Sequence, residues 1–253
     1  MTTVLDNFNP ETDYFKEPYP HVIIKNALPQ DLYDSLAKNF PVEQMKEKLP
    51  LIEGHTYRYL ANDVLYKKTI PVSKEWKKFF QTHTSQEYYD KVLELFKNDM
   101  PYGDDKIKKN VAVRGFAERH YYMVTDTQFV VHRPIVQGTT RTTHLDNPQE
   151  LYAGLLYFRQ TEDKSTGGDF DILETKQIKS VDKLKGREIS GDTEKNIVRT
   201  VKYEPNTFVM FLNTAKSVHG VTPRQNAEVD RLSINIIAET RSKGNVLFNL
   251  PNA

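Results

Sequence analysis

The chain has 253 residues, with 35 basic and 34 acidic side chains, a net charge of +1 and no cysteine. The balanced charge argues against a global field that recruits nucleic acid or a membrane, and the lack of cysteine excludes disulfides and thiolate metal sites. No apolar run approaches the length of a membrane span, and the first residues show no basic region followed by an apolar core. We therefore expect a cytoplasmic protein with no nucleic-acid or membrane partner.

The first hundred residues are predicted to be mainly helical. Residues 20–29 are typical of a short strand ending in a turn, and residues 30–40 of a helix that Pro41 ends. Two further helices are predicted over residues 73–80 and 85–98, because a serine precedes an apolar stripe in each. Residues 42–72 show no clear pattern.

From about residue 111 the apolar residues alternate with period two. The strands predicted from this alternation and from turn signals are 111–116, 118–124, 127–133, 151–158, 169–173, 197–204, 206–212, 217–221 and 231–239. Many short strands of this kind indicate a sandwich or a barrel. Residues 174–196 are lysine-rich and weakly patterned, and we consider a lid over a site and a plain surface excursion as alternatives.

Two histidines and a carboxylate have the pattern of a metal site. If residues 143–148 end a strand, His144 and Asp146 point to the same side of the sheet. His219 is the candidate for a second imidazole. Two histidines and one carboxylate bind Fe(II) on one face and leave the opposite positions open for substrates. A His-x-Asp triplet by itself is weak evidence for a metal site, so the interpretation of these residues as metal ligands depends on the residues that follow His219.

The predicted strand 231–239 carries an arginine on its inner face. Arg231, Ser233 and Asn235 alternate with Leu232, Ile234 and Ile236. A guanidinium on an inner face must find an anion, because an unpaired buried charge is very costly, and its planar fork suits a carboxylate. The pattern predicts a carboxylate-bearing co-substrate lying across the metal.

The combination of His144-x-Asp146, His219 and Arg231-x-Ser233 resembles the 2-oxoglutarate- and Fe(II)-dependent oxygenases. Residues 151–158 followed by Gly167-Gly168, and residues 206–213 before His219, are similar to the prolyl-4-hydroxylase-like branch; the likeness covers about residues 120–240. It implies a mainly β protein with flanking helices (α+β). Its core would be a double-stranded β-helix (a cupin-like jelly roll) with the N-terminal helices packed outside. Residues 1–253 would form a single oxygenase domain, with a strand and helical part over 1–105 and the jelly roll over 106–245.

The resemblance also implies an activity and its residues. The protein would be a dioxygenase that uses Fe(II), 2-oxoglutarate and O2, with ascorbate as an in vitro reductant, to hydroxylate an amino acid, a peptidyl residue or a small metabolite. His144, Asp146 and His219 would bind the metal. The remaining candidates are Arg231, Ser233, Tyr122 and Asn213 for the co-substrate, and Arg224 and Arg133 for the substrate.

Two positions narrow the activity within this resemblance. A carboxylate at position 146 argues against halogenation, since halogenating members have Gly or Ala there. Ile237 stands where the nucleic-acid demethylating branch has a second arginine, which argues against base repair.

Other readings stay open. A cupin-like protein could bind a metal or a small acid without turnover, and an isomerase on the same jelly roll would need neither Arg231 nor oxygen. Arg224 could also be an ordinary surface arginine. The sequence does not identify the substrate or the oligomeric state.

Overall fold

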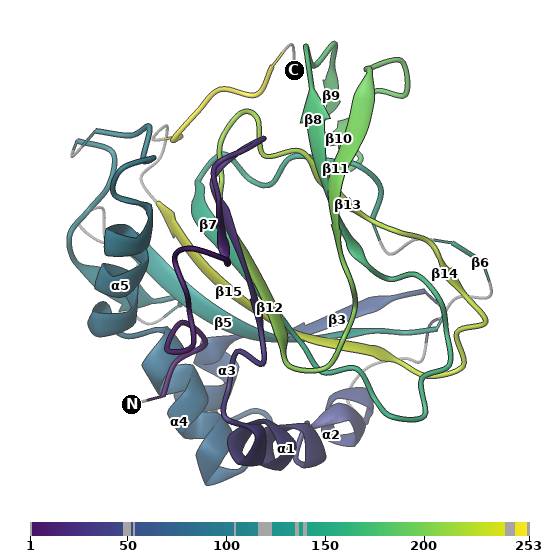
Figure 1. Ribbon diagram of the computed structural model, residues 1–253. Helices are drawn as coiled ribbons and strands as arrows, with labels where there is room; N and C mark the ends of the chain where they lie inside the picture. Colours follow the sequence, from purple (N-terminus) through teal and green to yellow (C-terminus); the bar gives the residue numbers. More distant parts are fainter. Residues whose placement is uncertain are drawn as a thin grey trace.

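The computed structural model describes residues 2–47, 52, 54–103, 105–115, 123–134, 137–138, 141–240 and 246–251. The fold is mixed α+β, with strands in several sheets and helices in the first half of the chain (Figure 1). The helices and sheets in that part of the chain agree with the predicted α+β class.

The larger sheet has eight strands and is antiparallel except for β4, which pairs parallel to β5. Its strand order is β1-β2-β12-β7-β15-β5-β3. The bounds are Tyr14–Phe15 (β1), His21–Lys25 (β2), Thr56–Tyr59 (β3), Val111–Val113 (β4), Met123–His132 (β5), Glu150–Tyr157 (β7), Thr207–Leu212 (β12) and Arg231–Thr240 (β15). The two central strands β5 and β15 pair along their full length, from Arg231 opposite His132 to Thr240 opposite Met123.

A smaller sheet lies across from the larger one, in the order β11-β8-β13 (Figure 1). These strands are Lys195–Val201 (β11), Phe170–Thr175 (β8) and His219–Val221 (β13). Two short hairpins complete the sheets: β9 (Val181–Asp182) with β10 (Glu188–Ile189), and β6 (Gln137–Gly138) with β14 (Arg224–Gln225).

The helices cover the outer face of the larger sheet (Figure 1). They are Gln30–Lys38 (α1), Val42–Lys46 (α2), Ala61–Leu65 (α3), Lys74–His83 (α4) and Gln86–Phe96 (α5). Trp76 of α4 packs edge-on to Phe129 of β5 with ring centroids 4.7 Å apart. The side chains of Ser73 and Ser85 accept hydrogen bonds from the first turns of α4 and α5, which confirms both predicted N-caps. None of the described helices has the length and hydrophobicity needed to cross a membrane.

Two stretches of the chain differ from the sequence-based expectation. One continuous strand, β5, replaces the predicted strands 118–124 and 127–133, although residues 116–122 lie outside the described part. Residues 42–72 form α2, β3 and α3, which are too short to show a period in the sequence.

The segment 174–196 packs against the rest of the protein and is hydrogen-bonded to it. Ile178, Val181 and Ile189 pack with Leu145 and Val218 in a small apolar cluster. The amide of Ile189 donates to the carbonyl of Thr143, and Leu145 donates to the carbonyl of Arg187. The β9–β10 hairpin therefore borders the segment that contains His144.

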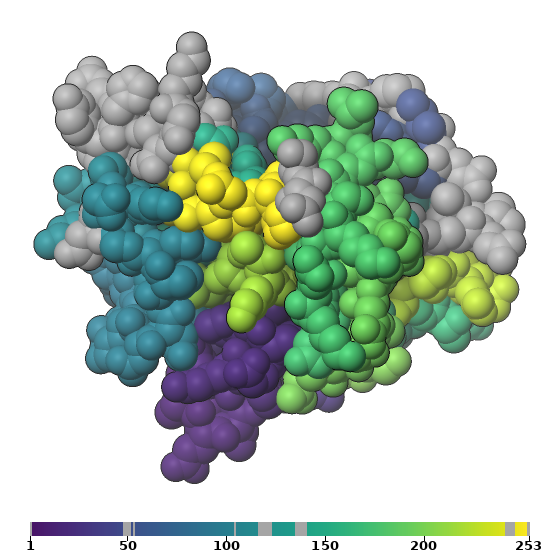
Figure 2. All heavy atoms as spheres, turned by 90° about the horizontal axis from the view of Figure 1, so that it is seen from above, coloured from purple at the N-terminus to yellow at the C-terminus, as the bar shows by residue number. Residues whose placement is uncertain are grey.

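The C-terminal residues close one end of the molecule. Figure 2 shows them, in yellow, between the helical part and the part that contains β8–β11. The amide of Leu247 donates to the carbonyl of Pro148, and Lys106 donates to the carbonyl of Leu247. The chain end is thus attached next to the His144 segment.

Candidate metal centre and co-substrate site

His144 and His219 lie on directly paired backbone segments. The amide of each residue donates to the carbonyl of the other, at N–O distances of 2.9 and 3.1 Å. The two rings are 4.2 Å apart between centroids, and Phe170 stacks on the ring of His219. Residues 75 positions apart in the sequence are therefore held side by side by two backbone hydrogen bonds.

The orientation of both rings is set by their Nδ1 atoms. Nδ1 of His144 donates to the carbonyl of Thr142 at 2.6 Å, and Nδ1 of His219 donates to the carbonyl of Ser217 at 2.8 Å. Because a carbonyl only accepts, Nδ1 carries the proton, and Nε2 of a neutral ring has a free lone pair. Both Nε2 atoms lie 3.5 Å from a carboxylate oxygen of Asp146. Three ligand atoms thus converge within 4.8 Å of one another.

The protonation states suit a divalent metal. Burial lowers the pKa of His144, and burial together with the neighbouring His144 lowers the pKa of His219 to about 3. Burial alone would raise the pKa of Asp146, but His219, His144 and Arg141 outweigh it and hold this pKa well below its usual range. At neutral pH the site offers two neutral imidazoles and a carboxylate, which is the form that binds a metal ion.

A buried asparagine connects the two segments that carry the ligands. Asn213 Nδ2 donates to the carbonyls of Asn147 and Glu150, at 2.8 and 3.0 Å, and its Oδ1 accepts from Ser217 Oγ. Asn213 does not line the cavity, so the structure places it behind the ligands instead of against the co-substrate.

Beside the three ligands lies a cavity of about 350 Å³ between the two sheets. Arg231 is 1% exposed and enters this cavity from the start of β15. Its Nε donates to the carbonyl of Gly168 at 3.0 Å, and its guanidinium lies over the rings of Tyr157 and Tyr203. Among the described residues, its Nη2 has no hydrogen-bond partner, and neither does the buried Oγ of Ser233, two positions further along the strand. Leaving such groups buried and unpaired is costly, so the pair fits a bound carboxylate.

The Gly167-Gly168 turn makes the contact with Arg231 possible. Gly167 has φ +76°, and a Cβ placed on it would lie 1.9 Å from the carbonyl oxygen of Pro223. Gly168 has φ +74° and packs against the side chains of Arg224 and Arg231. Only glycine fits this close approach of the two backbones.

Other candidates from the sequence lie elsewhere. Arg224 is buried outside the cavity, where its guanidinium binds Asp163 Oδ2 at 3.1 Å and Ser165 Oγ. Its donors are engaged within the protein, so we no longer assign it to the substrate. Arg133 also lies outside the cavity and pairs with Asp230 at 2.8 Å. Tyr122 lies outside the described residues.

Sequence reasoning missed four arginines that line the cavity: Arg58, Arg114, Arg141 and Arg187. Arg141 lies 3.4 Å from Asp146, and Arg114 pairs with the buried Asp126 and Glu239. Of these four, only Arg58 could have been predicted from the sequence to face the interior, because it alternates with Tyr57 and Tyr59 in a short strand.

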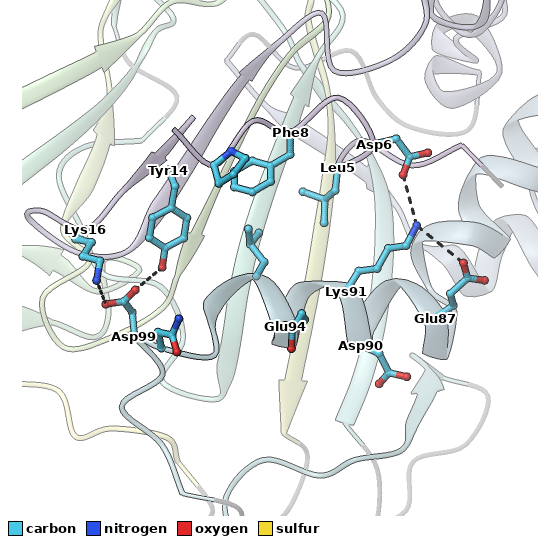
Figure 3. Close-up of a pocket in the computed structure, with 13 residues that line it drawn as sticks. Leu5, Asp6, Phe8, Tyr14, Lys16, Glu87, Asp90, Lys91, Glu94 and Asp99 are labelled. Carbon is cyan, nitrogen blue, oxygen red and sulfur yellow. Dashed lines mark hydrogen bonds and ion pairs between the residues drawn. The ribbon is translucent and has the colours of Figure 1, made fainter. Parts of the chain in front are cut away.

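A larger hollow of about 830 Å³ lies at the surface between the N-terminal residues and α5 (Figure 3). Figure 3 shows Leu5 and Phe8 facing the helix, with Lys91 paired to Asp6 and Glu87. None of its lining residues lines the cavity at His144, and it holds no histidine. The convergent chemistry therefore lies in the smaller, internal cavity.

Residues 120–238 match the family model of the 2OG-Fe(II) oxygenase superfamily. This match contains His144, Asp146 and His219, which the structure brings together, and Arg231 beside them. Residues 120–238 therefore match the 2OG-Fe(II) oxygenase superfamily, and they carry the buried His-Asp-His triad of a 2-oxoglutarate/Fe(II)-dependent oxygenase. No curated protein matches the sequence.

Several solved structures are similar to the chain. A prolyl-4-hydroxylase from Pseudomonas putida is 15% identical over 94% of this chain and 98% of that chain, with a TM-score of 0.49. A prolyl 4-hydroxylase from Phytophthora capsici is 16% identical over 89% of this chain and 60% of that chain, with a TM-score of 0.49. A prolyl hydroxylase from Trichoplax adhaerens, in complex with a hypoxia inducible factor peptide fragment, is 10% identical over 89% and 84%, with a TM-score of 0.46. Likeness at this level does not transfer a substrate to this chain.

Proposed function

We propose that this oxygenase hydroxylates an unactivated C–H bond of an amino acid, a peptidyl residue or a small metabolite. We also infer that its two facing sheets are a double-stranded β-helix and that residues 1–253 act as one domain of the prolyl-4-hydroxylase-like branch. The observation that carries the function is the single cavity in which three ligand atoms converge beside a buried arginine with an unpaired Nη2. A non-catalytic metal or acid binder has no need for both features.

In this proposal His144, Asp146 and His219 hold the metal through two Nε2 atoms and one carboxylate. Arg231, with Ser233, binds the distal carboxylate of 2-oxoglutarate. When bound, Fe(II) and 2-oxoglutarate supply the oxidising chemistry: O2 and the co-substrate convert a C–H to a C–OH, with succinate and CO2 as products. The protein contributes ligand geometry, charge complementarity and a cavity with little water.

The contacts of the Arg231 side chain support its assignment to the co-substrate. Arg231 stacks on Tyr157 and Tyr203 and donates to the carbonyl of Gly168, and these contacts hold the guanidinium in place before any ligand binds. Such preorganisation lowers the entropy lost on binding. Substitution by lysine would keep the charge but lose the fork that matches a carboxylate.

The first test is formation of succinate by the purified protein with Fe(II), ascorbate, 2-oxoglutarate and air. We expect succinate from the wild type and a loss of at least about 100-fold in His144→Ala, because one of the three metal ligands is removed. Binding of 2-oxoglutarate to the Mn(II)-loaded protein is measured in parallel by calorimetry. Arg231→Gln should weaken this binding by at least about 30-fold, since the buried carboxylate loses its charged partner.

The matched control for Arg231→Gln is Arg199→Gln, an arginine of β11 that lies over the ring of Phe15 and does not line the cavity. It should bind 2-oxoglutarate as the wild type does. If Arg231→Gln bound 2-oxoglutarate with the affinity of the wild type, Arg231 would not be the residue that binds the co-substrate. Metal binding without any affinity for 2-oxoglutarate would favour the cupin-like binder.

A further inference from the structure

Three arginines from three separate elements line the cavity and keep part of their surface exposed, and we call this solvent-facing part of the wall the opening of the cavity. They are Arg58 on β3, Arg141 just before the His144 segment, and Arg187 in the β9–β10 hairpin. Arg231 enters from the start of β15 and is buried, whereas Arg58 is exposed and Arg141 and Arg187 are partly exposed. The cavity thus has two positively charged regions, and the co-substrate occupies only one in the proposed function.

The guanidinium groups of Arg58 and Arg187 have donors that no described residue accepts from. The side chain of Arg58 makes no hydrogen bond or ion pair with any residue in the described ranges, although it lines the cavity. Arg187 uses only Nε, which donates to the carbonyl of Leu145 at 3.1 Å; its other side-chain donors have no partner within the described part of the chain. Arg141 is different, because it already contacts Asp146 and the carbonyl of Gly186.

Arg187 is held in an uncommon backbone conformation. Its φ is +67°, in the left-handed region that a residue with a Cβ seldom adopts. Its amide donates to the carbonyl of Asp182, and its carbonyl accepts from the amide of Leu145. Backbone strain of this kind persists where the surroundings impose it, and it often accompanies a ligand site. Here it brings the guanidinium to the segment that carries His144 and Asp146.

Two carboxylates, Asp146 and Glu150, line the cavity together with these arginines. Asp146 faces both histidines and is a proposed metal ligand, so its charge is used at the metal. Glu150 lines the cavity and is the remaining carboxylate on its wall, while Asp126 and Glu239 pair with Arg114. Burial lowers the pKa of Arg141, and the neighbouring Arg187 lowers it further, whereas Asp146 and Glu150 act in the opposite direction.

From these contacts we infer that the substrate carries an anionic group, a carboxylate or a phosphate, which Arg58 and Arg187 bind at the opening of the cavity. This inference rests on the proposed function, because it assigns the substrate to guanidinium groups other than that of Arg231, which the co-substrate occupies. Two guanidinium forks on different elements suit an oxyanion with several acceptor oxygens. They would fix the position of the substrate and thereby select which C–H bond faces the metal.

The test is calorimetric binding to the full chain with Mn(II) and saturating 2-oxoglutarate, so that Arg231 is already occupied. The probes form two matched pairs, glycerol 3-phosphate against glycerol and N-acetylglycine against its amide. We expect one charged probe to bind at least about 10-fold more tightly than its neutral counterpart. The phosphate pair and the carboxylate pair distinguish the two kinds of anion.

Arg58→Gln and Arg187→Gln should each weaken binding of that probe by about 5-fold or more. The control is Lys185→Gln, which removes an equal charge from the exposed part of the same hairpin and should leave the affinity unchanged. The inference is overturned if neither charged probe binds, or if the arginine variants bind as the wild type does. Binding of 2-oxoglutarate in the same experiments reports separately on the proposed function, so the two failures are distinguishable.

Discussion

At the scale of single residues, the site depends on groups that touch neither metal nor substrate. The carbonyls of Thr142 and Ser217 orient the two imidazoles, and the amide of Asn213 joins the segments on which they lie. Substitution of a residue that orients a metal ligand typically weakens metal binding by about 10- to 100-fold. Asn213 was predicted to contact the co-substrate; because it lies outside the cavity and bonds to both ligand-bearing segments, we propose that it positions the ligands.

We predict that Asn213→Ala weakens Mn(II) binding by about 10-fold or more and lowers the free energy of unfolding by about 2 kcal/mol. The substitution removes the side-chain donor to the carbonyl of Glu150 and one of the two donors to the carbonyl of Asn147, which keeps only the amide of Glu150. Calorimetry and chemical denaturation measure the two effects. Asn206→Ala is the control, because Asn206 makes comparable bonds with Leu28 far from the metal site and should cost stability only. Unchanged metal affinity in Asn213→Ala would rule out the positioning role.

At the scale of elements, the turn at Gly167-Gly168 connects the smaller sheet to the arginine of β15. Gly167 approaches the backbone of Pro223, and the carbonyl of Gly168 accepts from Arg231 Nε. A side chain at position 167 would separate the two segments and move that carbonyl. The turn therefore links local backbone conformation to the position of the proposed co-substrate site.

Gly167→Ala should destabilise the protein by about 2 kcal/mol or more, because it adds a left-handed alanine and a clash with a backbone oxygen. It should also weaken 2-oxoglutarate binding. Thermal unfolding and calorimetry test both. In Gly191→Ala the added Cβ meets no atom within 4 Å, so this variant should resemble the wild type. If both glycine variants behave alike, the close approach at Gly167 is unimportant.

At the scale of the whole molecule, a buried histidine ties the N-terminal residues to the helical layer. His83 of α4 donates from Nδ1 to the carbonyl of Phe79, and its Nε2 accepts from the amide of Val4. Burial lowers the pKa of His83 from 6.5 to about 4. The folded state therefore favours the neutral ring, and the resulting stability is present above pH 6.5 and is lost as the pH falls toward 4.

Denaturation measured across this range should show a loss of about 3 kcal/mol attributable to His83, given 1.36 kcal/mol per pKa unit. Other buried histidines titrate as well, so the comparison is with His83→Gln. A glutamine keeps one donor and one acceptor without titrating, and its profile should be flatter by about that amount. Parallel profiles for the two proteins would contradict the prediction.

Much of the fold could be predicted in stretches with a long apolar alternation or a clear helix start. The alternation along residues 231–239 correctly separated the inner face of β15 from the outer face, and the serines at 73 and 85 correctly marked the starts of α4 and α5. The elements between residues 42 and 72 could not be predicted, because they have four or five residues each and owe their form to packing on the larger sheet. The single-domain organisation stays a prediction.

By itself the sequence determined the kinds of chemistry available: His-x-Asp, a distant histidine and an inward arginine, with no thiolate to compete for the metal. Only the tertiary structure decided which polar groups meet. It paired His144 with His219 across two backbone bonds, directed Arg224 to Asp163, and brought Arg58 and Arg187 to one opening. The reason is physical: a side chain's residue type limits what it can bind, but its partners depend on strand register and on contacts between segments far apart in the chain.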